Sequence, residues 1–187
     1  MRLFISFNVE ESIRNQVSGI QLKVKEKQKP SSLEFIKWEN KNKFHITVFF
    51  LGDAKAEKAD VVIKELEIFT YENHPGKFLF ESNGFSCFPN FKYPRILFVD
   101  LKNTDEKATE FYKSLSSVIK DLGFVIEKKF RPHLTLARIK YGFKPEFLNL
   151  NEEIKFDFKI EISKFHLMES KLLQTGSLYK EIRSFDL

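Results

Sequence analysis

The chain has 187 residues, of which 42% are hydrophobic and 30% charged, and its formal net charge is +5. This balance is typical of a folded globular protein and excludes an intrinsically disordered chain. The single cysteine, Cys87, excludes an internal disulfide and favours a reducing compartment. The N-terminus lacks the apolar run of a signal peptide, and no later stretch is long enough to span a membrane. We therefore expect a cytoplasmic protein.

The first third of the chain alternates strand and helix patterns. Residues 2–9 have the composition of a strand, and the apolar residues that follow recur at helical spacing as far as Val24. This spacing predicts an amphipathic helix that ends before Pro30. We expect a loop at 30–32, a short strand at 35–38, a polar turn at 40–42 and an apolar strand that closes at Gly52-Asp53.

The remainder of the chain repeats this alternation. A second helix is predicted from Ala56 to about His74, and a third with Asn103 or Thr104 as its N-cap and Gly123 as its stop. The predicted strands of this part are 78–80, 84–88, 95–101, the strand around His133, 156–164, 165–168 and 177–185.

The two halves follow the same order: a helix, then a short connecting segment, then a strand that contains His-x-Thr. We infer an α+β protein of two similar lobes, each an antiparallel sheet that helices cover on its outer face. The uncovered faces would meet at a central cleft. We expect residues 1–187 to form a single, monomeric domain of two lobes.

The histidine and threonine of each repeated strand share one face. The segments are KFHITVFFLG, with His45 and Thr47, and RPHLTLARIK, with His133 and Thr135. Because side chains two positions apart in a strand point the same way, each pair would project together, opposite an apolar face. Phe49 has the same parity as His45, so in a regular strand it would offer a stacking surface to a nucleobase.

Two histidines that face one point can accept and donate a proton in the same reaction. Phosphodiester hydrolysis needs both transfers, and two threonine hydroxyls can hydrogen-bond the phosphate oxygens. Each histidine alone is equally consistent with an ordinary structural residue, the interpretation we keep for His74 and His166.

Other chemistries have less support in the sequence. Neither motif has a carboxylate or cysteine at ligand spacing, so no metal site is predicted. A nucleophile elbow and a glycine-rich phosphate loop are also missing. The basic residues that precede the motifs would attract a polyanion if they line the cleft mouth, although a solvated surface explains each of them as well. They are Lys41, Lys43, Lys128, Lys129 and Arg131.

The chain resembles the 2H phosphoesterase superfamily, in particular the RNA 2′,3′-cyclic phosphodiesterases once described as 2′-5′ RNA ligases. Five segments carry the resemblance in order over nearly the whole chain. They are RLFISF, FHITVFFLG, GFSCFPN with YPRILFV, FRPHLTLAR, and SKLLQTGSLYKEI with Ser170, Leu172, Gly176 and Tyr179.

The resemblance implies a bilobal fold with a pseudo-twofold axis and catalysis by His45 and His133 without metal or cofactor. It implies phosphate binding by Thr47 and Thr135. Arg138 matches the arginine that closes the second motif, but its parity is opposite to that of His133, so a regular strand would direct it away from the cleft. In the first motif, Phe49 stands beside the Phe50 that the family pattern leads us to expect.

The expected activity is hydrolysis of RNA 2′,3′-cyclic phosphate ends to 2′-phosphomonoesters, with weak reverse 2′-5′ ligation by the same groups. The resemblance favours His45 as the acid and His133 as the base. Two alternatives stay open: a single-stranded RNA binding module without turnover, and a phosphodiesterase that acts on small cyclic nucleotides or 2′-5′ oligonucleotides.

Overall fold

A computed structural model of the protein describes residues 1–126, 129–143, 145, 150–174 and 176–187. Its α-helices are α1 (Glu11–Glu26), α2 (Ala56–Asn73), α3 (Lys107–Asp121) and α4 (Leu150–Glu153), and short 3-10 turns cover Pro30–Phe35 and Lys41–Lys43. Its strands are β1 (Arg2–Asn8), β2 (Ile36–Trp38), β3 (His45–Asp53), β4 (Phe78–Phe88), β5 (Ile96–Asn103), β6 (His133–Ile139), β7 (Lys159–Ile162), β8 (Lys164–Leu173) and β9 (Gly176–Asp186).

The strands of the described residues form two antiparallel sheets. The first has the order β3-β1-β8-β9 and the second the order β2-β6-β5-β4-β7. Each sheet therefore contains one strand with His-x-Thr, and these two strands, β3 and β6, contact each other where the sheets meet. The predicted α+β architecture of two antiparallel sheets is confirmed.

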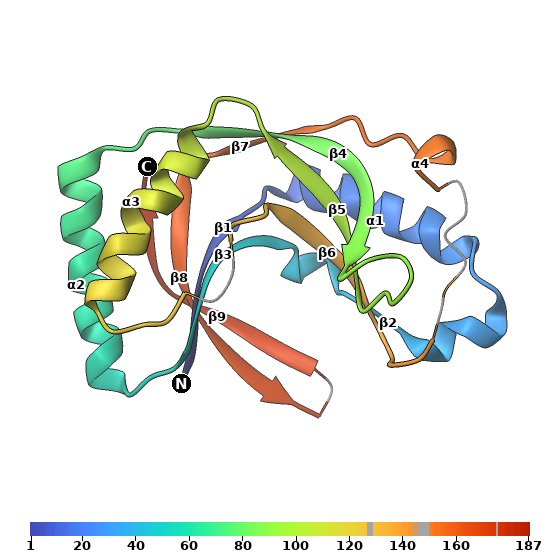
Figure 1. The fold of residues 1–187 in the computed structure, drawn as a ribbon, viewed down its shortest axis with the longest axis horizontal. Coiled ribbons are helices and arrows are strands. Elements are labelled where there is room, and N and C mark those ends of the chain that lie inside the picture. Colours follow the sequence, from blue (N-terminus) through green and yellow to red (C-terminus); the bar gives the residue numbers. More distant parts are fainter. Residues whose placement is uncertain (127–128, 144, 146–149, 175) are drawn as a thin grey trace.

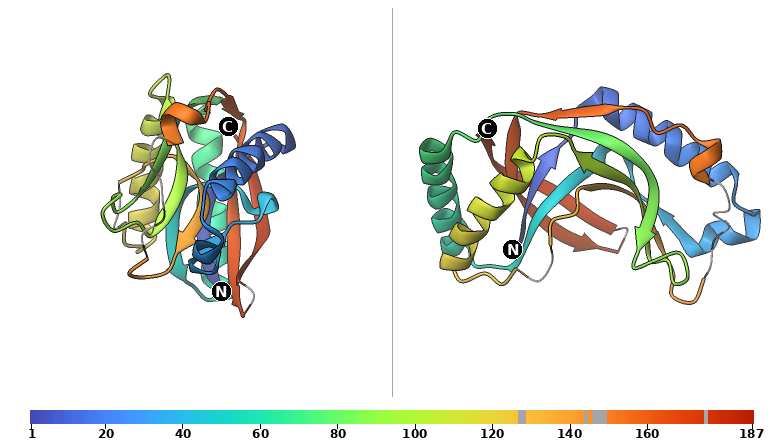
Figure 2. Two further views of the ribbon diagram at one scale, coloured as in Figure 1. Left: turned by 90° about the vertical axis from the view of Figure 1, so that its right-hand side faces the viewer. Right: turned by 45° about the horizontal axis from the view of Figure 1, so that its top comes forward.

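The helices lie outside the two sheets, as predicted (Figure 1). Helix α1 follows β1 of the first sheet but packs on the second, where the Gln21 side-chain amide donates to the carbonyls of Glu39 and Leu136, each at 2.8 Å. Helices α2 and α3 lie side by side at the end of the molecule opposite α4, as the two turned views also show (Figure 2). Helix α1 thus links the two halves of the chain.

Phenylalanine side chains fill the space where the two sheets and helix α3 meet. The ring of Phe7 on β1 lies 5.5 Å from that of Phe78 on β4, and Phe111 of α3 lies 5.2 Å from both Phe78 and Phe165. These rings belong to one contiguous cluster of buried side chains that includes both sheets. Burial of such large apolar side chains is the main stabilising contribution that holds the lobes together.

Most predicted elements are confirmed, and two differ for clear reasons. The strands expected at 78–80 and 84–88 form one strand, because Gly84 takes a positive φ of 86° at a β-bulge and the pairing with β5 resumes at Phe85. The predicted N-cap of α3 is wrong. Thr104 instead extends the pairing of β5 with β4 through bonds to the Leu79 carbonyl, and the helix begins three residues later.

The end of the chain also pairs differently from the prediction. The strand expected at 156–164 is limited to β7, and residues 164–173 form one long strand, β8, that pairs with β9 over its whole length. The loop expected at 30–32 lies in a 3-10 turn. Within the described residues, no helix combines the length and the apolar character that crossing a membrane requires.

Candidate active site

A large cleft separates the inner surfaces of the two sheets. Its volume is about 1910 Å³, and His45, Thr47, His133 and Thr135 all line it. The first pair comes from the start of β3 and the second from the start of β6, so each half of the molecule contributes one histidine and one threonine. The structure therefore brings together the four residues that the sequence singles out.

Both histidine rings are held in the same way by the backbone. Nδ1 of His45 lies 2.7 Å from the Lys43 carbonyl, and Nδ1 of His133 lies 2.7 Å from the Arg131 carbonyl. A carbonyl only accepts hydrogen bonds, so Nδ1 must be the protonated nitrogen in each ring. Nε2 of each neutral histidine is then the free base. That of His45 lies 3.0 Å from the Thr47 hydroxyl, which can donate to it.

The two histidines differ in their electrostatic surroundings. Burial lowers the pKa of His45 to about 4, and the charges of His133 and Arg138 act in the same direction. Burial also lowers the pKa of His133, but the carboxylate of Asp100 opposes this effect. Both rings are therefore neutral at pH 7 in the free protein, and a bound anion would make protonation of either one easier.

The strand pairing explains why a carboxylate lies beside His133 and not beside His45. In the first sheet His45 is opposite Asn8, whereas in the second sheet His133 is opposite Asp100. The two positions correspond, but one holds a neutral amide and the other a carboxylate. Asp100 also accepts a hydrogen bond of 3.1 Å from Nε of Arg131, whose guanidinium lies over the ring of Phe98 at 5.1 Å.

A β-bulge changes which phenylalanine of β3 faces the cleft. Thr47 pairs with Ser6 and Phe49 with Ile5, so Val48 is an extra residue in the strand. As a result Phe49 is only 3% exposed and stacks on Tyr112 at 4.7 Å, while Phe50 is 69% exposed. Phe49 still borders the cleft, but its ring is covered by Tyr112, so the prediction that it offers a base-stacking surface, which assumed a regular strand, is wrong. Phe50 takes that position in the cleft.

The corresponding bulge in β6 corrects the expectation for Arg138. Thr135 pairs with Phe98 and Ala137 with Leu97, so Leu136 is the extra residue, at the same distance from its histidine as Val48 in β3. The side chain of Arg138 therefore lines the cleft instead of leaving it.

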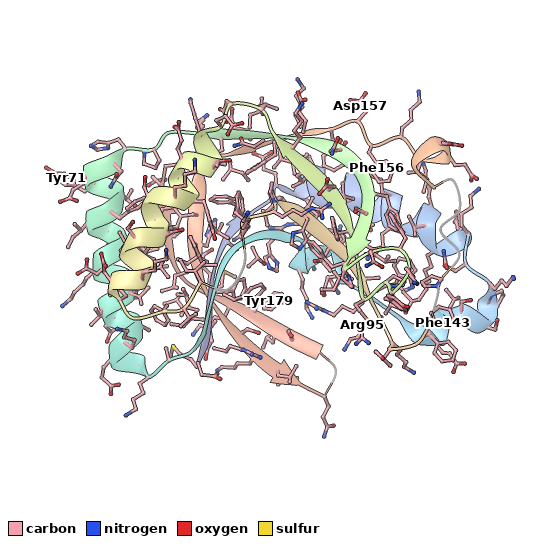
Figure 3. All side chains as sticks on the ribbon, in the orientation of Figure 1. Tyr71, Arg95, Phe143, Phe156, Asp157 and Tyr179 are labelled. Carbon is pink, nitrogen blue, oxygen red and sulfur yellow. The ribbon has the colours of Figure 1, made fainter. Side chains whose placement is uncertain are left out.

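Tyr179 fixes Arg138 from the opposite sheet. It belongs to β9 and lines the cleft (Figure 3), and its hydroxyl accepts a hydrogen bond from the Arg138 side chain. Its ring also meets that of His45 edge to face at 5.2 Å. The sequence places Tyr179 in a matching segment, but without a structural reason for its position. The contact joins residues that are far apart in the chain.

Only some of the predicted basic residues line the cleft. Lys43, Lys129 and Arg131 do, whereas Lys41 binds Glu11 and Asn15 of α1, each at 2.9 Å. Lys128 is outside the described residues. The whole cleft lining contains eight Lys or Arg and three Asp or Glu side chains, which gives it a positive charge.

The two remaining histidines lie outside the cleft lining. His74 is the left-handed residue that ends α2, and His166 is in β8, where its Nδ1 lies 2.8 Å from a carboxylate oxygen of Glu181. Within the described part of the chain, His, Cys, Asp and Glu side chains form no group of three or more that could hold a metal ion.

Comparison with known proteins places the chain among phosphoesterases. The sequence profile of the "LigT like Phosphoesterase" family matches residues 8–98 and 99–179. An RNA 2′,3′-cyclic phosphodiesterase of Archaeoglobus fulgidus is 33% identical over 188 residues, which cover 100% of both chains. One of Thermotoga maritima is 30% identical over 96% of this chain and 92% of its own.

Solved structures show the same fold. The protein TT0787 of Thermus thermophilus superposes with a TM-score of 0.81 over 100% of this chain and 98% of its own, at 23% identity. Escherichia coli LigT in complex with 3′-AMP gives a TM-score of 0.77 over 100% and 97%, at 18% identity. With the profile match over both halves, these findings show that the chain belongs to the LigT-like phosphoesterase family.

Proposed function

We propose that this protein is an RNA 2′,3′-cyclic phosphodiesterase, a single domain of two lobes that opens cyclic phosphate ends by acid–base catalysis with His45 and His133. The observation that carries the proposal is the shared tautomer of the two rings. Each Nδ1 binds a backbone carbonyl, so each Nε2 is the nitrogen left to exchange protons with a substrate in the cleft. The relatives with this activity, at about full length, support the same conclusion.

The reaction requires two proton transfers. A neutral Nε2 takes a proton from water as the water oxygen bonds to phosphorus. A protonated Nε2 on the other side gives its proton to the ribose oxygen as the phosphorus–oxygen bond breaks. The product is a phosphomonoester with a free ribose hydroxyl. Because both rings are neutral in the free protein, the negative charge of the bound phosphate must raise the pKa of the histidine that serves as the acid.

The other residues of the cleft suit the binding of an anion. Thr47 and Thr135 can donate their hydroxyl hydrogens to the non-bridging phosphate oxygens, and the Arg138 guanidinium can add a charged hydrogen bond. The exposed ring of Phe50 offers a stacking surface to the terminal base. His45 as acid, His133 as base and the 2′-phosphomonoester as product stay predictions from the family resemblance. The cytoplasmic location and the monomeric state stay predictions from the sequence.

The same groups could also serve 2′-5′ ligation. If the 5′-hydroxyl of a second RNA takes the place of water, the same base takes its proton, the same acid protonates the departing 3′ oxygen, and a 2′-5′ linkage forms. We expect this ligation to be weak, because water is in large excess over RNA ends.

Product analysis tests the proposal. A short RNA that ends in a 2′,3′-cyclic phosphate is incubated with the protein, with and without an excess of EDTA, and the product is identified by ³¹P NMR against both phosphomonoester standards. We expect a 2′-phosphomonoester at the same rate in both samples, since no step uses a metal. A 3′-phosphate product would reverse the proposed orientation of the ribose. RNA that binds without turnover would support the binding-module alternative instead.

A further inference from the structure

The cleft is larger than the proposed reaction needs. Pockets that hold a small molecule have volumes of roughly 300–1,000 Å³, whereas this cleft measures about 1910 Å³. A cyclic mononucleotide bound between the two histidines would therefore leave much of the space open. The remaining volume leaves room for a longer ligand.

Part of this space follows β3 away from His45. The strand is nine residues long and advances roughly 25 Å at about 3.3 Å per residue, toward the start of α2. Residues 123–126, which follow α3, line the cleft together with this end of β3 (Figures 1 and 2). Six residues that line the cleft here define what we call the distal arm: Phe50, Lys55, Lys58, Phe124, Val125 and Lys129.

The distal arm combines exposed apolar surface with positive charge. Phe50 and Val125 are 69% and 77% exposed. Nζ of Lys58 lies 5.5 Å from the centre of the Phe124 ring, which holds this ammonium group at the wall of the arm. The carboxylates of Asp53 and Glu57 also line this part of the cleft, together with the guanidinium of Arg2.

This combination fits a single-stranded nucleic acid. Its bases stack on apolar faces whatever their sequence, and its phosphates need cations at intervals along the strand. A duplex would bury its bases and could not use Phe50 or Val125. A purely anionic small molecule would use the lysines but not the apolar faces.

We infer that the nucleotides 5′ to the cyclic phosphate of the RNA substrate lie in the distal arm. This inference rests on the proposed function, because the arm begins beside His45 and Thr47. It separates RNA ends from small cyclic nucleotides, both of which the sequence leaves open as substrates.

A length series tests the inference. We would measure kcat/KM for a 2′,3′-cyclic mononucleotide and for RNAs of two, three and five nucleotides with the same terminal cyclic phosphate. Stacking of the first added base should raise kcat/KM about fivefold or more. Each phosphate contact should add about 0.7 to the slope of log(kcat/KM) against log salt. Equal values for all lengths would overturn the inference but keep the proposed function, whereas hydrolysis of none of them would overturn both.

Variants locate the RNA within the cleft. Replacement of Lys58 and Lys129 together with alanine should lower the ratio of kcat/KM for the trinucleotide to that for the mononucleotide, by on the order of threefold for each lysine. The matched control is Lys64→Ala, which removes an exposed lysine from the same helix outside the cleft lining and should keep the ratio. If Lys37→Ala, on the other side of the cleft, lowers the ratio and the distal variants do not, the RNA leaves the cleft by the other side.

Discussion

Phe49 and Phe50 are adjacent in the sequence but lie in opposite environments. Phe49 is buried against Tyr112, and Phe50 is exposed in the cleft, because the bulge at Val48 shifts the facing of the residues that directly follow it in β3. The same chemical change at the two positions should therefore have two different effects. This pair allows the stacking role of Phe50 to be separated from stability.

We predict that Phe49→Ala lowers the free energy of unfolding by about 3–5 kcal/mol, since it empties a packed site. Phe50→Ala should change it by less than about 0.5 kcal/mol, since the ring is exposed. For cyclic-phosphate RNA, Phe50→Ala should instead lower kcat/KM by the equivalent of about 1–3 kcal/mol of lost stacking. Denaturant unfolding and steady-state kinetics measure the two effects. Normal kcat/KM for Phe50→Ala would remove this residue from substrate binding.

At the scale of single residues, the sequence predicts the positions before each bulge but not those after it. His45 and Thr47 precede Val48, so their shared face follows from strand periodicity alone. Phe50 and Arg138 come after a bulge, where that periodicity fails. One signal is present in the sequence: two consecutive apolar residues follow the threonine in each motif. Without the partner strands, this signal does not distinguish a bulge from a strand buried on both faces.

Burial is the main cause of the low pKa of both histidines, and the residue opposite each one in the neighbouring strand adds a smaller difference between them. Asn8 is opposite His45, and Asp100 is opposite His133. The carboxylate raises the pKa of His133 against the effect of burial, and the amide has no charge with which to do so for His45. The proposed mechanism requires one histidine neutral and the other charged, and kcat/KM reports their titration in the free protein, so it should follow a bell-shaped pH profile.

We predict that the maximum of kcat/KM lies below pH 6.5, because both pKa values are lower than usual. His133 keeps the higher pKa of the two and so sets the alkaline limb whether it is the acid or the base; Asp100→Asn should lower this pKa further and move that limb to lower pH. Asn8→Asp should raise the pKa of His45 and move the acid limb to higher pH. Asp60→Asn, on the exposed face of α2, is the control and should shift neither limb. An alkaline limb that stays in place for Asp100→Asn would contradict this account of His133.

Helix spacing is the most reliable predictor among the elements. The spacing of the apolar residues predicts the ends of α1 and α2 to within a few residues. It does so because these apolar residues form the face that each helix buries. The start of α3 could not be predicted in this way. Thr104 is a good N-cap by composition, but its hydroxyl and its amide both bond to the Leu79 carbonyl, and this tertiary contact outweighs the local preference.

The molecule as a whole places two similar strands around one cleft. The repeat of His-x-Thr in the sequence predicts the pair and the two sheets, and the contact between β3 and β6 brings the pair together. The packing of α1 on the sheet of the other half is not visible in the sequence, since periodicity defines the buried face of a helix but not its partner. The width of the cleft is equally a product of tertiary packing.

The central claim is that His45 and His133 act as one catalytic unit. The most direct test is the hydrolysis rate of a cyclic-phosphate trinucleotide by His45→Ala, His133→Ala and the double variant, each shown to be folded by its thermal unfolding. We predict that each single variant loses roughly two to four orders of magnitude in rate. The double variant should lose little more than the slower single one, because either loss disables the shared proton transfers. A folded single variant with a near-normal rate would contradict the claim.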